Sequence, residues 1–284
     1  MRLIVASIES PSSPLIVQVG AFSLRWYGTL IAIGVIVGGW LVKRELRRRG
    51  LDPEAVYTIA AWCVPAGLVG ARLYHVATDY ELFRGHLERI PQIWTGGLGL
   101  PGVVAGGVLG AAIGARRAGL SALVVFDCLA PGLIAAQALG RWGNYANQEL
   151  FGAPSTLPWA VEIAPANRPA AYPHATTFQP TFLYESLWNL AVLALLLWLI
   201  PRVWRSIRPG TIFLGYLAAY SIGRLVTESL RSDFAHMIAG LRVNQWLFAI
   251  VLVTTAPIVV RRLVPVLRAG SGGQTDDDTR AASR

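Results

Sequence analysis

The sequence contains few charged residues. Asp, Glu, Lys and Arg make up 14% of its 284 residues, against roughly 25% in an ordinary soluble domain, whereas hydrophobic residues make up 54%. This composition excludes an ordinary soluble protein and indicates an integral membrane protein.

Cysteine and histidine are also scarce. The two cysteines, Cys63 and Cys128, lie in apolar segments with no spacing typical of a disulfide framework or a metal site. The four histidines stand singly, and none forms a pair at ligand spacing. The sequence shows no internal repeat and no glycine-rich phosphate loop before a helix. We therefore expect neither a metal ion nor a cofactor.

Long apolar runs are abundant instead. Seven segments approach the 17–25 residues that a membrane-spanning helix needs: 22–42, 56–76, 98–115, 122–139, 181–200, 211–230 and 245–260. Arg72 interrupts the second, and glycines fill the third, which we expect to pack in the centre of the bundle because glycine permits close helix contacts in lipid. The sequence predicts an all-α polytopic membrane protein with about seven transmembrane helices.

The basic residues follow alternate segments. Arginine-rich clusters come after the first, third, fifth and seventh apolar runs, so seven spans place them all on one side, which the positive-inside rule identifies as the cytoplasm. The N-terminus is then outside and the C-terminus cytoplasmic. These loops beside anionic lipid account for most of the net charge of +9 without a nucleic-acid partner.

One domain is enough to describe the chain. We expect a membrane-embedded domain over residues 1–268, in which the first 20 residues are a retained outer segment and not a cleaved signal peptide. An outer insertion of about 145–179 separates the fourth and fifth helices, and its prolines favour an irregular loop or short strands, best in the stretch 158–163. Residues 269–284 are hydrophilic and predict a disordered cytoplasmic tail.

A polar stretch follows directly on the fourth apolar run. Residues 140–152 read GRWGNYANQELFG and contain one guanidinium, three side-chain amides and one carboxylate, from Arg141, Asn144, Asn147, Gln148 and Glu149. Such groups are costly at the mouth of a membrane segment, so they indicate a polar ligand there.

The sixth apolar run carries a polar stripe. Tyr220, Arg224, Thr227, Glu228 and Arg231 recur at steps of three, four and seven residues and share one helix face. Arg224 and Glu228 could be a purely structural ion pair. However, Arg141 is expected at a similar depth, and two arginines together favour an anionic ligand. Arginine suits phosphate because it donates bidentate, charge-assisted hydrogen bonds, so we expect a phospholipid headgroup.

The polar stretch also resembles a known family. Gly140, Arg141, Gly143, Asn144, Asn147, Glu149 and Gly152 match the signature of bacterial prolipoprotein diacylglyceryl transferases, a Gly-Arg-x-Gly-Asn core followed by Asn, Glu and Gly. Four further segments resemble that family in the same order: Arg25–Gly28, Trp94–Gly97, Pro180–Glu185 and Gly223–Arg231. The resemblance covers roughly residues 20–260.

This resemblance implies a reaction and its partners. The enzyme would transfer the diacylglyceryl group of phosphatidylglycerol to the lipobox cysteine thiol in a prolipoprotein signal peptide, in the bacterial cytoplasmic membrane. A thioether forms and glycerol 1-phosphate leaves, as the first step of lipoprotein maturation. The attacking sulfur belongs to the substrate, which agrees with two unremarkable cysteines in this chain.

The resemblance also implies site residues. Arg141, Arg224, Tyr27 and Glu228 are the expected catalytic residues. Substrate-binding roles are expected for Arg141 and six further residues: Asn144, Asn147, Glu149, Gly152, Glu185 and Arg231.

The chain departs from the family pattern at two positions. Pro101 and Gln179 stand where the family often has histidine, and neither can remove a proton. Proton removal would then run through Glu185, Tyr27, the lipid phosphate or water, or the chain is a catalytically silent paralogue. A phospholipid- or anion-binding transporter is a further alternative, although the internal symmetry common in transporters is not visible.

Overall fold

The computed structural model describes residues 7–20, 22–93, 96–97, 99–233 and 235–281, and this part of the chain is mostly helical. The α-helices are α1 (Trp26–Arg48), α2 (Ala55–Thr78), α3 (Leu100–Arg117), α4 (Ala122–Ala146), α5 (Thr181–Val203), α6 (Thr211–Leu230) and α7 (Val243–Ala281). Among the described residues, α1, α2, α4, α5 and α7 are long and apolar enough to cross a membrane. This is the architecture of a polytopic membrane protein, as the sequence predicts.

The chain divides into two compact units. The first comprises Met1–Gly38 together with Ala130–Arg284, and the second comprises Gly39–Leu129. Both α1 and α4 contribute one part to each unit.

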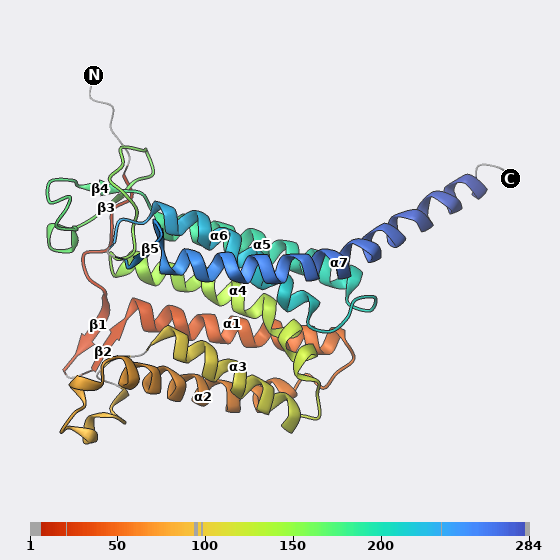
Figure 1. The fold of residues 1–284 in the computed structure, drawn as a ribbon, viewed down its shortest axis with the longest axis horizontal. Coiled ribbons are helices and arrows are strands. Elements are labelled where there is room, and N and C mark those ends of the chain that lie inside the picture. The colour runs from red at the N-terminus through yellow and green to blue at the C-terminus, as the bar shows by residue number, and fades with distance from the viewer. Residues whose placement is uncertain (1–6, 21, 94–95, 98, 234, 282–284) are drawn as a thin grey trace. The chain divides into compact units, whose positions relative to one another are not determined.

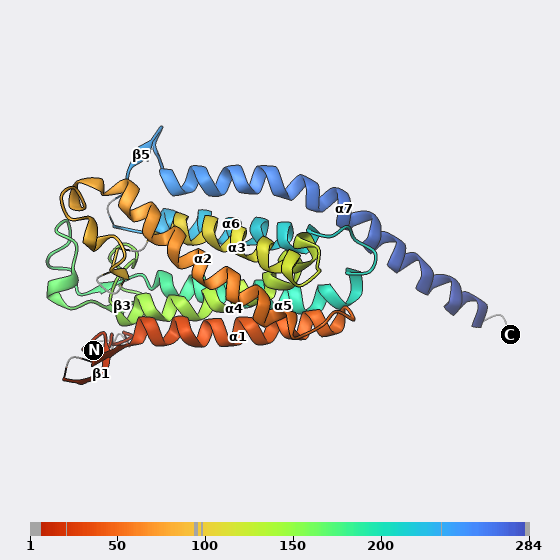
Figure 2. The same ribbon diagram turned by 90° about the horizontal axis from the view of Figure 1, so that it is seen from below.

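In the second unit, α2 and α3 pack through glycines, side by side in both views (Figures 1 and 2). A Cβ atom on Gly70 would lie 2.3 Å from the Gly102 carbonyl oxygen, and one on Gly110 would lie 2.4 Å from the Trp62 carbonyl oxygen. No side chain fits there, so the glycines serve the close helix contact expected of them. Large apolar side chains on α3, including Leu109, are exposed within this unit, and the expectation that α3 packs in the centre of the bundle stays a prediction.

Arg72, which interrupts the second apolar run, holds the loop after α2 by hydrogen bonds to its backbone. Its guanidinium donates to the carbonyl oxygens of Arg89 (2.5 Å), Ile90 (2.7 Å) and Gly96 (2.8 Å). A buried guanidinium needs acceptors for its donors, and here the backbone of the loop supplies them. Trp94 and Thr95, which carry part of the family resemblance, lie outside the described residues.

In the first unit, α6 packs against both α5 and α7 (Figure 1). The core between these helices is aliphatic and includes Ile134, Val192, Leu196, Ile200 and Val203. Small residues let α1 approach α4 in this unit: a Cβ atom on Gly34 would lie 3.2 Å from Ala136, and one on Gly38 would lie 3.3 Å from the Gly132 carbonyl oxygen.

Several helix boundaries differ from the sequence prediction. Residues 22–25 form strand β2 (Phe22–Arg25), which pairs antiparallel with β1 (Leu15–Val19), so α1 begins at Trp26 and not at residue 22. The fourth helix continues to Ala146 and carries much of the polar stretch on its last turns. The backbone of α7 continues to Ala281, where the sequence predicts a disordered tail from 269.

The insertion between α4 and α5 contains little regular structure. Strands β3 (Val161–Glu162) and β4 (Thr177–Phe178) pair antiparallel, and one turn of 3-10 helix, η4, spans Pro165–Asn167. β3 lies within the stretch 158–163 for which a strand is predicted. A hairpin of β5 (Met237–Ile238) and β6 (Leu241–Arg242) joins α6 to α7. Insertion and hairpin lie at the same end of the first unit (Figure 1).

Candidate functional site

Two arginines from different helices meet at one carboxylate. Arg141 of α4 and Arg224 of α6 place Nη2 and Nη1, respectively, 2.7 Å and 2.8 Å from the same oxygen, Oε2 of Glu185 on α5. Glu185 and Arg224 are buried, whereas the Arg141 side chain remains 17% exposed. The structure therefore brings together the two arginines that the sequence expects at one depth, and Glu185 is the group that joins them.

Glu228 is the second carboxylate that pairs with several arginines, and we call these ion-paired residues around Glu185 and Glu228 the arginine cluster. Its Oε2 accepts from Arg224 Nη2 and lies 3.5 Å from Arg231 Nη1, while its Oε1 lies 3.1 Å from Arg242 Nη1 and 3.3 Å from Asn244 Nδ2. The side chain is 1% exposed. One carboxylate thus holds three guanidinium groups at the end of α6.

Asp233 also forms ion pairs with Arg231 and Arg242, beyond the end of α6. Arg231 donates to it as a fork, with Nε and Nη2 each 2.8 Å from a carboxylate oxygen, and Arg242 Nη1 lies 3.3 Å away. Burial alone would raise the pKa of Asp233, but the hydrogen bonds and charges of Arg231 and Arg242 outweigh it and lower the pKa. Sequence reasoning missed Asp233, Arg242 and Asn244; an arginine immediately before an apolar run was the available signal for Arg242.

The amides of the polar stretch orient this side of the cluster. Asn144 accepts from Arg141 Nη1 (3.3 Å) and donates to Glu149 Oε1 (2.9 Å), and Asn147 donates to the same oxygen (3.2 Å). Gln148 instead ties the insertion to the N-terminal segment by donating to the Pro11 carbonyl and accepting from the Ala164 amide. Asn144 therefore belongs to the cluster, and Gln148 holds the surrounding backbone.

Tyr27 lies against the same part of α4. A Cβ atom on Gly143 would be 2.4 Å from Cδ2 of its ring, so the ring rests on the bare backbone between Arg141 and Asn144. Tyr27 is 39% exposed, which leaves it accessible to a ligand beside Arg141.

This contact predicts the effect of a methyl group at position 143. Gly143→Ala should displace the Tyr27 ring and reduce activity by about tenfold, the effect of losing one well-placed hydrogen bond of roughly 1.4 kcal/mol. Gly39→Ala is the matched control, because it lies on the same helix as Tyr27 with nothing within 4 Å of the new Cβ. Initial rates of both variants, normalised to folded protein, test this; equal rates would contradict the role of Tyr27.

Close packing explains why residue 152 is a glycine. A Cβ atom there would lie 2.8 Å from the Leu230 carbonyl oxygen and 2.9 Å from Cβ of Gln179. Its neighbour Ala153 donates to Leu230 O at 3.1 Å, which joins the insertion to the end of α6. The expected contact of Gly152 with substrate stays a prediction.

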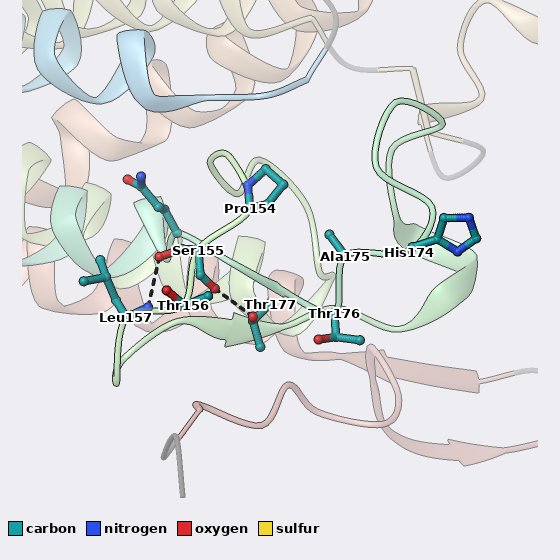
Figure 3. Close-up of a pocket in the computed structure, with 9 residues that line it drawn as sticks. Pro154, Ser155, Thr156, Leu157, His174, Ala175, Thr176 and Thr177 are labelled. Carbon is teal, nitrogen blue, oxygen red and sulfur yellow. Dashed lines mark hydrogen bonds between the residues drawn. The ribbon is translucent and has the colours of Figure 1, made fainter. Parts of the chain in front are cut away.

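The two positions that lack histidine lie in different units. Pro101 is in the first turn of α3, in the second unit. Gln179 lies in the first unit, where its backbone accepts from Gly152 and donates to Ala153. The Gln179 side chain borders an open groove of about 590 Å³ in the insertion, with Ser155 and His174 also on its wall (Figure 3). No arginine or lysine lines this groove, so the arginine cluster is the better phosphate site.

Comparison with known proteins gives one consistent result. A sequence model described as prolipoprotein diacylglyceryl transferase matches residues 14–261. A protein of Frankia alni named phosphatidylglycerol--prolipoprotein diacylglyceryl transferase is 51% identical over 92% of this chain and 70% of its own length. Two Streptomyces coelicolor proteins, named as transferases 2 and 1, are each 42% identical over 96% and 99% of this chain and 89% and 82% of their own lengths. The chain belongs to the prolipoprotein diacylglyceryl transferase family.

Proposed function

We propose that this protein transfers the diacylglyceryl group of phosphatidylglycerol to the lipobox cysteine of prolipoproteins. The observation that carries the proposal is the convergence of Arg141 and Arg224 on one oxygen, Glu185 Oε2, at 2.7 Å and 2.8 Å. Two guanidinium groups that reach one oxygen atom can also reach two oxygens of one phosphate. The names of the relatives supply the same pair of substrates.

The charge that develops in this reaction fits the arginines. The substrate sulfur, as a thiolate that has already lost its proton, forms a bond to the glycerol carbon of the diacylglyceryl group, and the bond from that carbon to the phosphate oxygen breaks. The electron pair goes to the phosphate, so a diester with one negative charge becomes a monoester with two. Arg141 and Arg224 stabilise the added charge in a site that largely excludes water, which is often the largest single contribution to catalysis.

The other residues position these two. Asn144 orients Arg141 and can donate to the headgroup, and Glu185 and Glu228 fix Arg224 between them. Tyr27, resting on Gly143, is placed to orient the lipid. Asn147 and Glu149 support Asn144, while Arg231 and Gly152 join the end of α6 to the insertion.

We further propose the finer topology. Seven spans, with the N-terminus outside and the C-terminus cytoplasmic, are supported by the four basic clusters on alternate connections. α3 and α6 are less apolar than the other helices, but each packs against a more apolar neighbour, α2 and α7 respectively. This arrangement puts the arginine cluster and the insertion on the outer side of a bacterial cytoplasmic membrane.

The pH dependence of the rate addresses the missing histidine. Oε2 of Glu185 already accepts hydrogen bonds from two arginines, so we expect this oxygen to stay engaged with them and not with the thiol. A lipobox thiol with an ordinary pKa of about 8.5 is mostly protonated near neutral pH. We therefore expect the rate of glycerol 1-phosphate release to climb with pH up to about 8.5, with no inflection near 6.5. An inflection near 6.5 that Glu185→Gln abolishes, and that the four single His→Asn variants leave unchanged, would make Glu185 the base.

Complementation tests the function itself. Expression of this chain in bacteria depleted of their own transferase should restore diacylglyceryl modification of a reporter prolipoprotein, measured by mass spectrometry of the lipobox peptide. Arg141→Ala, expressed to the same level, is the control and should not restore it. An unmodified reporter despite folded, membrane-inserted wild-type protein would favour a silent paralogue or an anion-binding transporter.

A further inference from the structure

The first unit has a second group of arginines at the other end of α6. A cavity of about 470 Å³ is lined by Ser206, Arg208, Ile258, Arg261, Arg262 and Pro265. These residues come from the connection between α5 and α6 and from α7. Thr211 and Glu228 mark the two ends of α6, and a rise of about 1.5 Å per residue separates them by about 25 Å. The cavity is therefore distinct from the arginine cluster around Glu185.

The arginines of this cavity differ from those of the cluster in one respect. Within the part of the chain that the structure describes, none of Arg208, Arg261 and Arg262 forms an ion pair with a carboxylate. Arg262 Nη1 lies 3.4 Å from the Thr211 hydroxyl, which fixes its direction from α7 toward the start of α6. Three positive charges and the Ser206 hydroxyl thus surround one space without an anion from the protein.

The walls beside the cavity are suited to acyl chains. Ile258 lines it, and Val260 and Leu267 on α7 are exposed large apolar residues. α7 is one of the helices long and apolar enough to cross a membrane. Cationic donors next to an exposed apolar helix surface match the two parts of a phospholipid, since basic pockets between membrane helices bind anionic headgroups.

We propose that this cavity binds the phosphate of an anionic phospholipid, at the end of the first unit opposite the transfer site. The headgroup lies among Arg208, Arg261 and Arg262, and its acyl chains run along α7. A separation of about 25 Å is close to the thickness of a bilayer core, about 30 Å, so this lipid belongs to the opposite leaflet from the substrate lipid. It holds α7 against the α5–α6 connection and takes no part in the transfer reaction.

Neighbouring arginines provide a matched control. Arg202 and Arg205 belong to the same end of α5 but stack on the rings of Trp198 and Trp204, 4.4 Å and 5.0 Å from the ring centroids, and do not line the cavity. The double variants Arg261→Gln/Arg262→Gln and Arg202→Gln/Arg205→Gln remove the same charge from the same end of the protein. Only the first removes it from the cavity.

The test is lipid retention by the purified full chain. Native mass spectrometry of delipidated protein titrated with phosphatidylglycerol should give an apparent Kd at the second site about 30-fold weaker for Arg261→Gln/Arg262→Gln, since each basic residue near an anionic lipid contributes about one factor of five. The control double variant should change it less than threefold. Arg261→Lys/Arg262→Lys keeps the charge and should recover part of the affinity, which separates a lost site from a misfolded one.

Three results would overturn the proposal. Equal retention by both glutamine double variants would show that only overall charge matters. Equal retention of phosphatidylcholine would remove the requirement for an anionic headgroup. Displacement of the lipid by inorganic phosphate at the same concentration would show a site for free phosphate and not for a lipid. None of these results depends on transfer activity, which the Arg141 variants measure separately.

Discussion

Arg141→Ala should lose about 100- to 1,000-fold in the rate of glycerol 1-phosphate release, the usual cost of removing one charge-stabilising donor. The side chain reaches Glu185 Oε2 and Asn144 Oδ1 with separate nitrogen atoms, so its fork is already directed at the point where Arg224 arrives. Arg141→Lys keeps the charge but loses the fork, and should lose about 10- to 100-fold, the worth of one charged hydrogen bond.

Arg84→Ala is the control for this prediction. Arg84 lies in the connection after α2 and its side chain is 73% exposed, so its replacement should leave the rate unchanged. Both proteins are compared as detergent-purified enzyme, with single-turnover rates on a fluorescent phosphatidylglycerol and a lipobox peptide. A near-normal rate for Arg141→Ala would remove this residue from the site.

Glu228 and Arg224 should separate into a stability effect and an activity effect. Glu228→Ala leaves Arg224, Arg231 and Arg242 without a shared, fully buried carboxylate, and breaking a buried ion pair costs about 3–5 kcal/mol. We expect its Tm to fall by roughly 10 °C, and Glu228→Gln, which keeps the shape, to fall less. Arg224→Gln should instead abolish turnover in the fraction of protein that still folds.

The alternative, a merely structural pair, gives a different pattern. Arg224→Gln and Glu228→Gln would then lower Tm about equally and leave the surviving folded protein equally active. Thermal unfolding and the rate per folded molecule, measured on the same preparations, distinguish the two. Equal residual activity in the two variants would count against phosphate binding by Arg224.

Much of the fold was predictable because hydropathy finds lipid-length segments. Hydropathy predicts the sixth run at 211–230, which are the bounds of α6 in the structure. It predicts that the fourth run ends at residue 139, whereas α4 continues to Ala146, because hydropathy reports the loss of apolar side chains and not the end of backbone hydrogen bonding. The sequence does not predict the β1–β2 hairpin, because β2 merges with the apolar run that follows and β1 falls in the outer segment before it.

Helical periodicity predicts neighbours in the site only where the residues share one helix. The periodicity of α6 placed Arg224 and Glu228 on one face, and the structure joins them. Arg242 and Asp233 reach Glu228 and Arg231 from the connection to α7, and no periodic pattern relates a hairpin to a helix. The sequence predicts Glu185 as a substrate contact or a proton acceptor, whereas its place between two arginines depends on how three helices pack.

The ion-paired cluster has a charge imbalance that bears on product release. Four guanidinium groups, those of Arg141, Arg224, Arg231 and Arg242, face three carboxylates, those of Glu185, Glu228 and Asp233, which leaves one positive charge in excess. A phosphodiester bearing one negative charge brings the site to electroneutrality. The departing monoester carries two, and the second has no cation left to neutralise it in a place where solvation is poor. We therefore expect release of the headgroup to need water or a cation from solution to take up the second charge, a requirement that the diester substrate does not have.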